Sequence, residues 1–174
     1  MKKLSMEELE RLTITQYKES EKVPLVIVLD NVRSQHNIGS IFRTADAFRI
    51  STIHLCGITA TPPNREIQKT ALGATESVDW LYFKTTLDSV MLLKKDGYQI
   101  VALEQAVGSI MLNNYKPNTY SKIAIILGNE VNGVSDEIME LCDVCIEIPQ
   151  SGTKHSLNVS VAAGIAIWQI CNTL

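Results

Sequence analysis

Short apolar runs recur along the chain, and the stretches between them are amphipathic. The run at residues 25–29 is apolar at every position, which is typical of a strand covered on both faces. Five further candidate strands of similar length follow, and some of them include polar residues. We therefore expect strands at residues 25–29, 52–55, 80–83, 99–103, 122–127 and 144–148.

Between these runs, apolar residues return every three or four positions, which is the spacing of one buried helix face. This spacing predicts helices at residues 38–48, 65–72, 87–95, 135–141 and 156–171. Strands and helices thus alternate along the chain. Such alternation predicts an α/β domain with a mostly parallel sheet flanked by helices.

The last predicted helix carries apolar side chains on nearly every side. A helix of this kind must be covered all round. In a chain of 174 residues, part of that cover is expected to come from a second copy. The sequence therefore predicts a homodimer.

Residues 1–22 differ from the rest because they are rich in Glu and Lys. Leu4, Leu9 and Leu12 have a loosely helical spacing, and Ser5 followed by Glu8 is a candidate capping box. We expect residues 1–22 to form a short N-terminal helical extension and residues 23–174 to form one domain.

The overall composition is 45% hydrophobic and 20% charged, which is ordinary for a globular protein. No apolar run approaches the roughly 20 residues of a membrane span, and the first residues lack the apolar core of a secretory signal. We expect a cytoplasmic protein with no membrane partner. Cys142 and Cys145 have C-x-x-C spacing, but no second pair or nearby His completes a metal site, so no metal is expected.

The net charge of −3 argues against a protein that simply coats nucleic acid. The charge is uneven, however. Residues 25–75 carry five basic and three acidic side chains, a local +2, whereas residues 121–174 carry two basic and six acidic ones, a local −4. A basic face beside an acidic one is compatible with RNA binding.

Three polar segments follow predicted strands, and the first begins at Asn37. Asn37 lies where it could cap the helix that follows. Arg43 points off the predicted buried face of that helix. For this segment alone, an ion pair between Arg43 and Asp46 on a solvated face is the favoured interpretation.

The second segment, residues 126–135, carries Gly128 and Gly133 at the G-x-x-x-x-G spacing of a phosphate-binding loop. Val134 stands where such a loop needs lysine, so a nucleoside triphosphate site is disfavoured. The glycines are equally suited to a tight turn, and Glu130 can be interpreted as an ordinary carboxylate in a loop.

The third segment, residues 148–163, leads from a strand through a polar loop into the last helix. Helix capping is the simplest role for Ser156 and Asn158. His155 adjoins Ser156, but sequence neighbours rarely reach nucleophile–base geometry, and no G-x-S-x-G motif is present. Hydrolysis is therefore disfavoured.

In order and spacing, the three segments resemble the motifs of the SpoU/TrmH-type RNA ribose methyltransferases of the SPOUT superfamily. The resemblance covers about residues 23–174 and implies a catalytic domain whose C-terminal part forms a trefoil knot. The matching strings are Asn37-x-Gly39-Ser40-Ile41-x-Arg43-Thr44-Ala45, Leu127-Gly128-Asn129-Glu130-x-x-Gly133, and Ile148-Pro149 followed by Ser156-Leu157-Asn158-Val159-Ser160-Val161-Ala162.

The resemblance also implies S-adenosylmethionine as the methyl donor and a ribose 2′-hydroxyl of RNA as the acceptor. Arg43 would be the central catalytic residue, either stabilising alkoxide charge or serving as an unusual base. Asn37 and Glu130 would position Arg43 and the nucleotide. The cofactor would lie against six residues: Leu127, Gly128, Ile148, Ser156, Leu157 and Asn158.

Ser156 and Asn158 would also shape the acceptor pocket. The resemblance further implies a dimer, because proteins of this class usually associate through the knot region and the last helix. Basic residues near the first motif would contact RNA: Arg33, Arg43, Arg49, Arg65 and Lys69.

Two other functions stay open: a non-catalytic RNA-binding or ribosome-associated factor, and a SPOUT enzyme that methylates a base. The chain lacks the large N-terminal RNA-binding domain of some rRNA-directed relatives and also the long basic terminal extensions of some tRNA-directed ones. Between the two RNAs, tRNA is slightly favoured.

Overall fold

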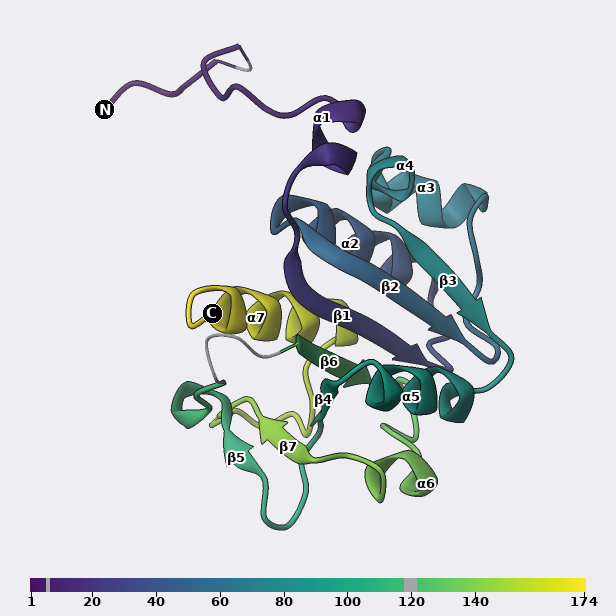
Figure 1. The fold of residues 1–174 in the computed structure, drawn as a ribbon. Coiled ribbons are helices and arrows are strands. Elements are labelled where there is room, and N and C mark those ends of the chain that lie inside the picture. Colours follow the sequence, from purple (N-terminus) through teal and green to yellow (C-terminus); the bar gives the residue numbers. More distant parts are fainter. Residues whose placement is uncertain (6, 118–121) are drawn as a thin grey trace.

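The computed structural model describes residues 1–5, 7–117 and 122–174, and seven strands in this part of the chain form one parallel sheet (Figure 1). The strand order is β3-β2-β1-β6-β4-β7-β5, and every pairing is parallel. The predicted α/β class is confirmed. The strands are β1 (Val23–Asp30), β2 (Ile50–Cys56), β3 (Trp80–Phe83), β4 (Tyr98–Leu103), β5 (Ile110–Met111), β6 (Lys122–Leu127) and β7 (Val144–Glu147).

Helices connect most of these strands, and the five predicted ones are all present in the described chain. The longest are α2, which follows β1, and α7, which ends the fold. The helices are α1 (Ile14–Glu19), α2 (Gln35–Ala47), α3 (Arg65–Ala71), α4 (Ala74–Ser77), α5 (Thr86–Lys95), α6 (Asp136–Met139) and α7 (Val159–Cys171), with a 3₁₀ turn, η1, at Leu112–Asn114.

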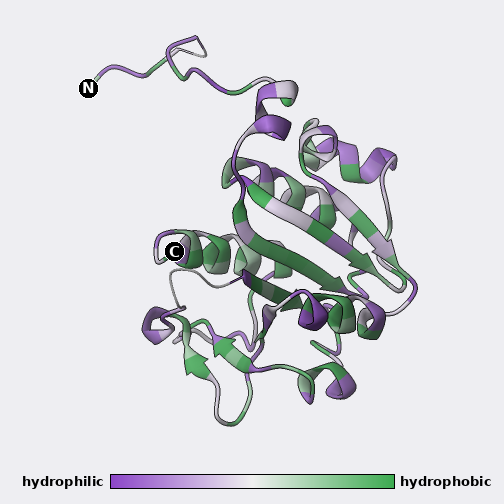
Figure 2. Ribbon diagram, viewed as in Figure 1, coloured by the Kyte–Doolittle hydropathy of each residue, from purple (hydrophilic) through white to green (hydrophobic). Residues whose placement is uncertain are grey.

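The sheet is the middle of three layers, because alternate residues of its central strands face two separate apolar clusters. Leu25, Ile27 and Leu29 of β1 pack with residues of α2 and α7. Val26 and Val28 pack instead with residues of α5 and α6. Figure 2 shows hydrophobic residues along most of β1 and β6, the strands at the centre of the sheet. Burial on both faces explains their uninterrupted apolar runs.

The N-terminal extension differs from its predicted form. Ser5 and Glu8 do exchange the predicted hydrogen bonds, but only a turn at residues 7–10 follows them. Leu4, Leu9 and Leu12 are exposed, so no apolar surface supports a helix there. The helix of this region is α1, which begins after Thr13, and the buried ring of Tyr17 holds it to the body.

The close approach of α2 to α3 explains the glycine of the first motif. A Cβ at Gly39 would lie 2.1 Å from Thr70 Oγ1 and 2.2 Å from the carbonyl oxygen of Ile67. The absence of a side chain therefore lets α3 pack directly on α2. This contact orients the helix that carries Asn37 and Arg43.

One half of the α7 surface packs inward and the other half does not. Ala163, Ala166, Ile167 and Ile170 are buried in the core. α7 also packs against α2.

In the described part of the chain, no helix is long and apolar enough to cross a membrane. The trefoil knot implied by the resemblance stays a prediction.

Candidate active site

A cavity of about 740 Å³ opens at the carboxyl ends of β4, β6 and β7. Ligands of parallel sheets bind at this edge, where the loops that follow neighbouring strands meet. All six residues assigned to the cofactor by resemblance line it, as does Glu130. The lining residues are Leu103–Ala106, Leu127–Val134, Asp136, Met139, Glu147, Ile148, Gln150, Ser156–Val159 and Ala162.

The loop after β6, residues 128–134, is closed by its own backbone. The N–H of Asn129 donates to the carbonyl of Gly133 at 2.9 Å, and the N–H of Gly133 donates back at 2.9 Å. A Cβ at Gly128 would lie 2.1 Å from the carbonyl carbon of Gly133 and 2.2 Å from the nitrogen of Val134. Glycine is therefore required at residue 128 by backbone contact within the loop.

Hydrogen bonds join the three predicted motifs into one chain. The Asn37 amide donates to Glu130 Oε1 at 3.1 Å, and the Asn158 amide donates to Asn37 Oδ1 at 3.1 Å. These residues are separated in sequence by 93 and 121 positions. The structure thus brings Asn37, Glu130 and Asn158 together beside the cavity, although Asn37 does not line it.

The expected capping role of Asn37 is wrong. Helix α2 begins at Gln35, and Ser34 is its N-cap, with Ser34 Oγ accepting from the N–H of Asn37 at 3.3 Å. Asn37 therefore lies in the first turn, where its side chain is free to bond to Glu130 and Asn158.

Capping by Asn158 is confirmed, whereas the predicted start of the last helix is too early. Helix α7 begins at Val159, and Asn158 Oδ1 accepts from the N–H of Ser160 at 2.9 Å. Ser156 and Leu157 therefore belong to the loop, where they face the cavity.

Glu130 binds the start of α2 in addition to Asn37. Its Oε2 accepts from the N–H of Arg33 at 3.0 Å, and its Oε1 accepts from the N–H of Ser34 at 2.9 Å. Burial alone raises the pKa of the Glu130 carboxyl, but the N–H groups of Arg33 and Ser34 and the Asn37 amide together hold it below its ordinary value. Glu130 is therefore a carboxylate anion at the N-terminal end of α2 at neutral pH, where the helix dipole favours negative charge.

Arg43 is exposed on α2 and does not line the cavity. The favoured pair with Asp46 is absent: among the described residues no ion pair involves Arg43, and Asp46 Oδ1 accepts from Ser77 Oγ at 2.5 Å. The guanidinium therefore stays available on the helix that Glu130 and Asn158 anchor.

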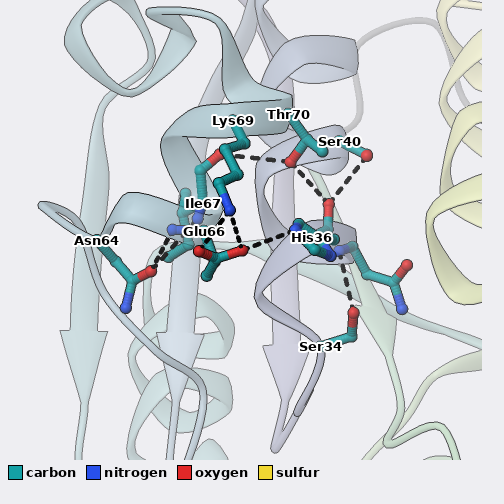
Figure 3. A network of polar contacts seen from close by, with 9 residues as sticks. Ser34, His36, Ser40, Asn64, Glu66, Ile67, Lys69 and Thr70 are labelled. Atoms are coloured by element: carbon teal, nitrogen blue, oxygen red, sulfur yellow. Dashed lines mark hydrogen bonds and ion pairs between the residues drawn. The ribbon is translucent and has the colours of Figure 1, made fainter.

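The basic residues near the first motif differ in their surroundings. Arg33 and Arg65 are exposed, whereas Lys69 donates to both oxygens of Glu66, at 2.7 and 2.8 Å. Figure 3 shows that Glu66 also contacts His36, at 3.0 Å, so one carboxylate joins α3 to the first turn of α2. The Lys69 hydrogen bond and, less strongly, His36 lower the pKa of Glu66. The positive charge of Lys69 is thus partly neutralised.

The Cys142–Cys145 pair lies outside the cavity lining. Both thiols are free, and burial raises the pKa of Cys142 to about 11 and also raises that of Cys145. Protonated thiols are poor nucleophiles and poor ligands.

Several cavity residues lie outside the three motifs, chiefly Glu104 and Gln105 after β4. In the sequence, a polar pair directly after a predicted strand was the signal that could have indicated these cavity residues. The strand order was needed to place that pair between the loops after β6 and β7.

Comparison with known proteins agrees with this geometry. Residues 24–168 match the model of the SpoU rRNA Methylase family, and the chain belongs to that family. The solved structures that resemble it include a TrmH/SpoU tRNA modifying enzyme from A. aeolicus, with a TM-score of 0.81, 27% identity, and coverage of 92% of this chain and 81% of that one. Another is an AdoMet-bound rRNA methyltransferase from Sinorhizobium meliloti, with a TM-score of 0.80, 28% identity, and coverage of 88% and 58%.

Two curated relatives illustrate the range of the family. The 23S rRNA (guanosine-2′-O-)-methyltransferase RlmB of Vibrio parahaemolyticus is 32% identical over 148 residues, which are 85% of this chain and 59% of that protein. The tRNA (guanosine(18)-2′-O)-methyltransferase of Aquifex aeolicus is 35% identical over 156 residues, 87% and 70% of the two chains. The chain spans under two thirds of the length of several of the relatives it matches.

Proposed function

We propose that this protein transfers a methyl group from S-adenosylmethionine to a ribose 2′-hydroxyl of RNA. The observation that carries the proposal is the hydrogen-bonded chain Glu130–Asn37–Asn158, which joins all three motifs beside one cavity. Membership of the SpoU family supports the same reaction. tRNA is the substrate we favour, because the tRNA-directed relative from Aquifex aeolicus is covered over 70% of its length.

The cavity suits the proposed donor in size and in charge. Its volume of about 740 Å³ lies within the roughly 300–1,000 Å³ of small-molecule sites. Its lining carries Glu104, Glu130, Asp136 and Glu147 and no Lys, Arg or His among the described residues. Negative surroundings favour a ligand with a sulfonium cation. When bound, S-adenosylmethionine supplies a methyl group that is already activated.

The protein's own residues mainly align the acceptor and stabilise charge. We propose that Leu127, Gly128, Ile148 and Leu157 hold the donor, while Ser156 and Asn158 shape the acceptor side. Arg43 lies six residues beyond Asn37, about 9 Å along the same helix. Its guanidinium is a permanent cation, suited to stabilising negative charge on the 2′-oxygen as the hydroxyl proton is lost.

We propose that RNA lies along α2 and α3. Arg33, Arg43 and Arg65 are exposed there, and Lys69 adds charge when an RNA phosphate competes for it with Glu66. The four free thiols suit the cytoplasm, where we place the reaction.

The proposed reaction is tested with the purified protein, S-adenosylmethionine, and tRNA or rRNA from a strain that lacks the gene. Mass spectrometry of the digested RNA should find a new 2′-O-methylated nucleoside, in tRNA. A base-methylated product would favour a base methyltransferase. Calorimetric binding of S-adenosylhomocysteine without any RNA product would favour a non-catalytic factor.

We further propose that two copies associate through α7. Val161, Ile165 and Trp168 are 51%, 39% and 56% exposed and follow one another at helical spacing, forming an apolar stripe on the uncovered side. Wild type should therefore have about twice the monomer mass of 19.3 kDa by light scattering.

Replacement of Trp168 by aspartate removes the largest side chain of this stripe and places a charge there. We expect the dimer dissociation constant to rise about 100-fold, as for the loss of a central aromatic contact. Met91→Asp is the matched control, because Met91 is 54% exposed on α5, on the other side of the sheet. A monomeric wild type, or Trp168→Asp that stays dimeric, would contradict the proposed interface.

A further inference from the structure

We propose that Glu104 and Gln105, which belong to none of the three motifs, are positioning residues that hold both loops of the cofactor cavity. The inference rests on the proposed function, and it assigns a role to a part of the chain that the motifs leave out. The two residues follow β4 directly. Glu104 bonds to the loop after β6, and Gln105 bonds to the loop after β7.

The strand order places this pair between the two loops. β4 lies between β6 and β7, and Leu103 is in register with Leu127 on one side and with Ile146 on the other. Because all three strands run parallel, their carboxyl ends reach the same edge of the sheet together. The residues after Leu103 therefore lie between residues 128–134 and residues 148–158.

The carboxylate of Glu104 is hydrogen-bonded to the loop after β6. Oε2 accepts from the N–H of Val134 at 3.2 Å, and Oε1 accepts from the N–H of Gln105 at 2.8 Å. Gly133 has a φ of +68°, and a Cβ there would lie 2.2 Å from Glu104 Oε2. The glycine thus provides both the left-handed turn and the space that the carboxylate occupies.

Two contacts from the end of β1 and the residue that follows it hold the same loop elsewhere. The Asn129 amide donates to the carbonyl of Asn31 at 2.8 Å, and the N–H of Ser135 donates to Asp30 Oδ2 at 3.2 Å. The loop is therefore fixed from the end of β1, from the start of α2 through Glu130, and from the end of β4. The residues after β4 differ from those of the other two supports because they line the cavity themselves.

Gln105 is hydrogen-bonded to the loop after β7. Its side-chain amide donates to the carbonyl of His155 at 2.8 Å, directly before Ser156. Residues 151–158 are all exposed, so the core does little to fix this part of the loop. A hydrogen bond from the end of β4 to His155 therefore restrains Ser156 and Leu157 at the cavity.

Loops that are ordered before a ligand arrives lose less conformational entropy on binding. A positioning pair should therefore weaken every ligand of the cavity, including one that does not carry the sulfonium charge. It should also alter KM for S-adenosylmethionine more than kcat, since neither residue is assigned contact with the reacting atoms.

The test measures calorimetric Kd values for S-adenosylmethionine and S-adenosylhomocysteine with the full chain. Glu104→Gln leaves one carbonyl acceptor for two N–H groups, and Gln105→Glu removes the donor to His155. We expect each variant to weaken both ligands about tenfold, the effect of one lost hydrogen bond. Glu137→Gln is the charge-matched control, because Glu137 is exposed on α6 outside the lining, and it should bind both ligands as wild type does.

The outcomes separate this inference from the proposed function. If wild type binds S-adenosylhomocysteine and both variants bind it equally well, only the positioning role is overturned. Weakening of S-adenosylmethionine alone would also overturn it, because Glu104 would then act by its charge. A wild type that binds neither ligand overturns this inference and the proposed function together. If Glu104→Gln does not fold, the exposed Gln105→Glu decides the question.

Discussion

Arg43→Ala is expected to lower the rate of methyl transfer to RNA about 100- to 1,000-fold, the loss typical of removing one group that stabilises developing charge. The structure gives a reason to expect no equal loss of cofactor affinity. Arg43 is exposed and lies outside the cavity lining, so its removal leaves the loops that hold the donor unchanged. Kd for S-adenosylhomocysteine should stay close to that of wild type.

Single-turnover kinetics with saturating RNA and S-adenosylmethionine measure this loss directly. Arg43→Lys keeps the charge but not the planar guanidinium, and we expect it to recover only a small part of the rate. Lys95→Ala removes a cation from α5, on the other side of the sheet, and should react as wild type does. Undiminished transfer by Arg43→Ala would remove Arg43 from the mechanism.

Gly128→Ala should have the second large effect, a loss of about 10- to 100-fold in affinity for S-adenosylhomocysteine. The added methyl group would meet the backbone of Gly133 and Val134 at 2.1 and 2.2 Å, and backbone atoms cannot move aside without opening the loop. Overpacking of this kind costs about 1–3 kcal/mol. The opened loop would displace Asn129 and Glu130 from the cavity.

Gly152→Ala is the matched control for this substitution. Gly152 lies in the other loop, and a Cβ there would meet no heavy atom within 4 Å. Calorimetry should find its affinity equal to that of wild type. If Gly128→Ala also binds normally, the loop after β6 does not hold the cofactor, and the assignment of the cavity fails.

Local patterns in the chain were enough to predict most of the fold. Each predicted strand from 25–29 to 144–148 overlaps a strand of the sheet. The runs of β1 and β6 are apolar at nearly every position because these strands are covered on both faces. The prediction failed where local signals lacked a tertiary partner. Ser5 and Glu8 form their hydrogen bonds, yet no helix follows them because Leu4, Leu9 and Leu12 have nothing to pack on.

The motifs predicted the residues of the candidate site more reliably than their contacts. Leu127, Gly128, Ile148 and Ser156 all line one cavity, as the resemblance implies. Asn37, however, is not the cap of α2, and Arg43 does not pair with Asp46. The neighbouring Ser34 caps α2, which leaves the Asn37 side chain to bond to Glu130. Asp46 instead accepts from Ser77, which is distant in sequence.

The sequence by itself determined the order and type of the elements, the three motifs and their family, because these depend on burial patterns and on residue types at short spacing. The tertiary structure alone decided which loops meet. Strand order places β4 between β6 and β7, which joins Glu104 and Gln105 to both loops. It also places β1 beside β6, which brings Asn37 to Glu130, and Asn158 reaches Asn37 from the start of α7. A strand's own residues encode its burial but not its neighbours, so these contacts cannot be deduced from spacing along the chain.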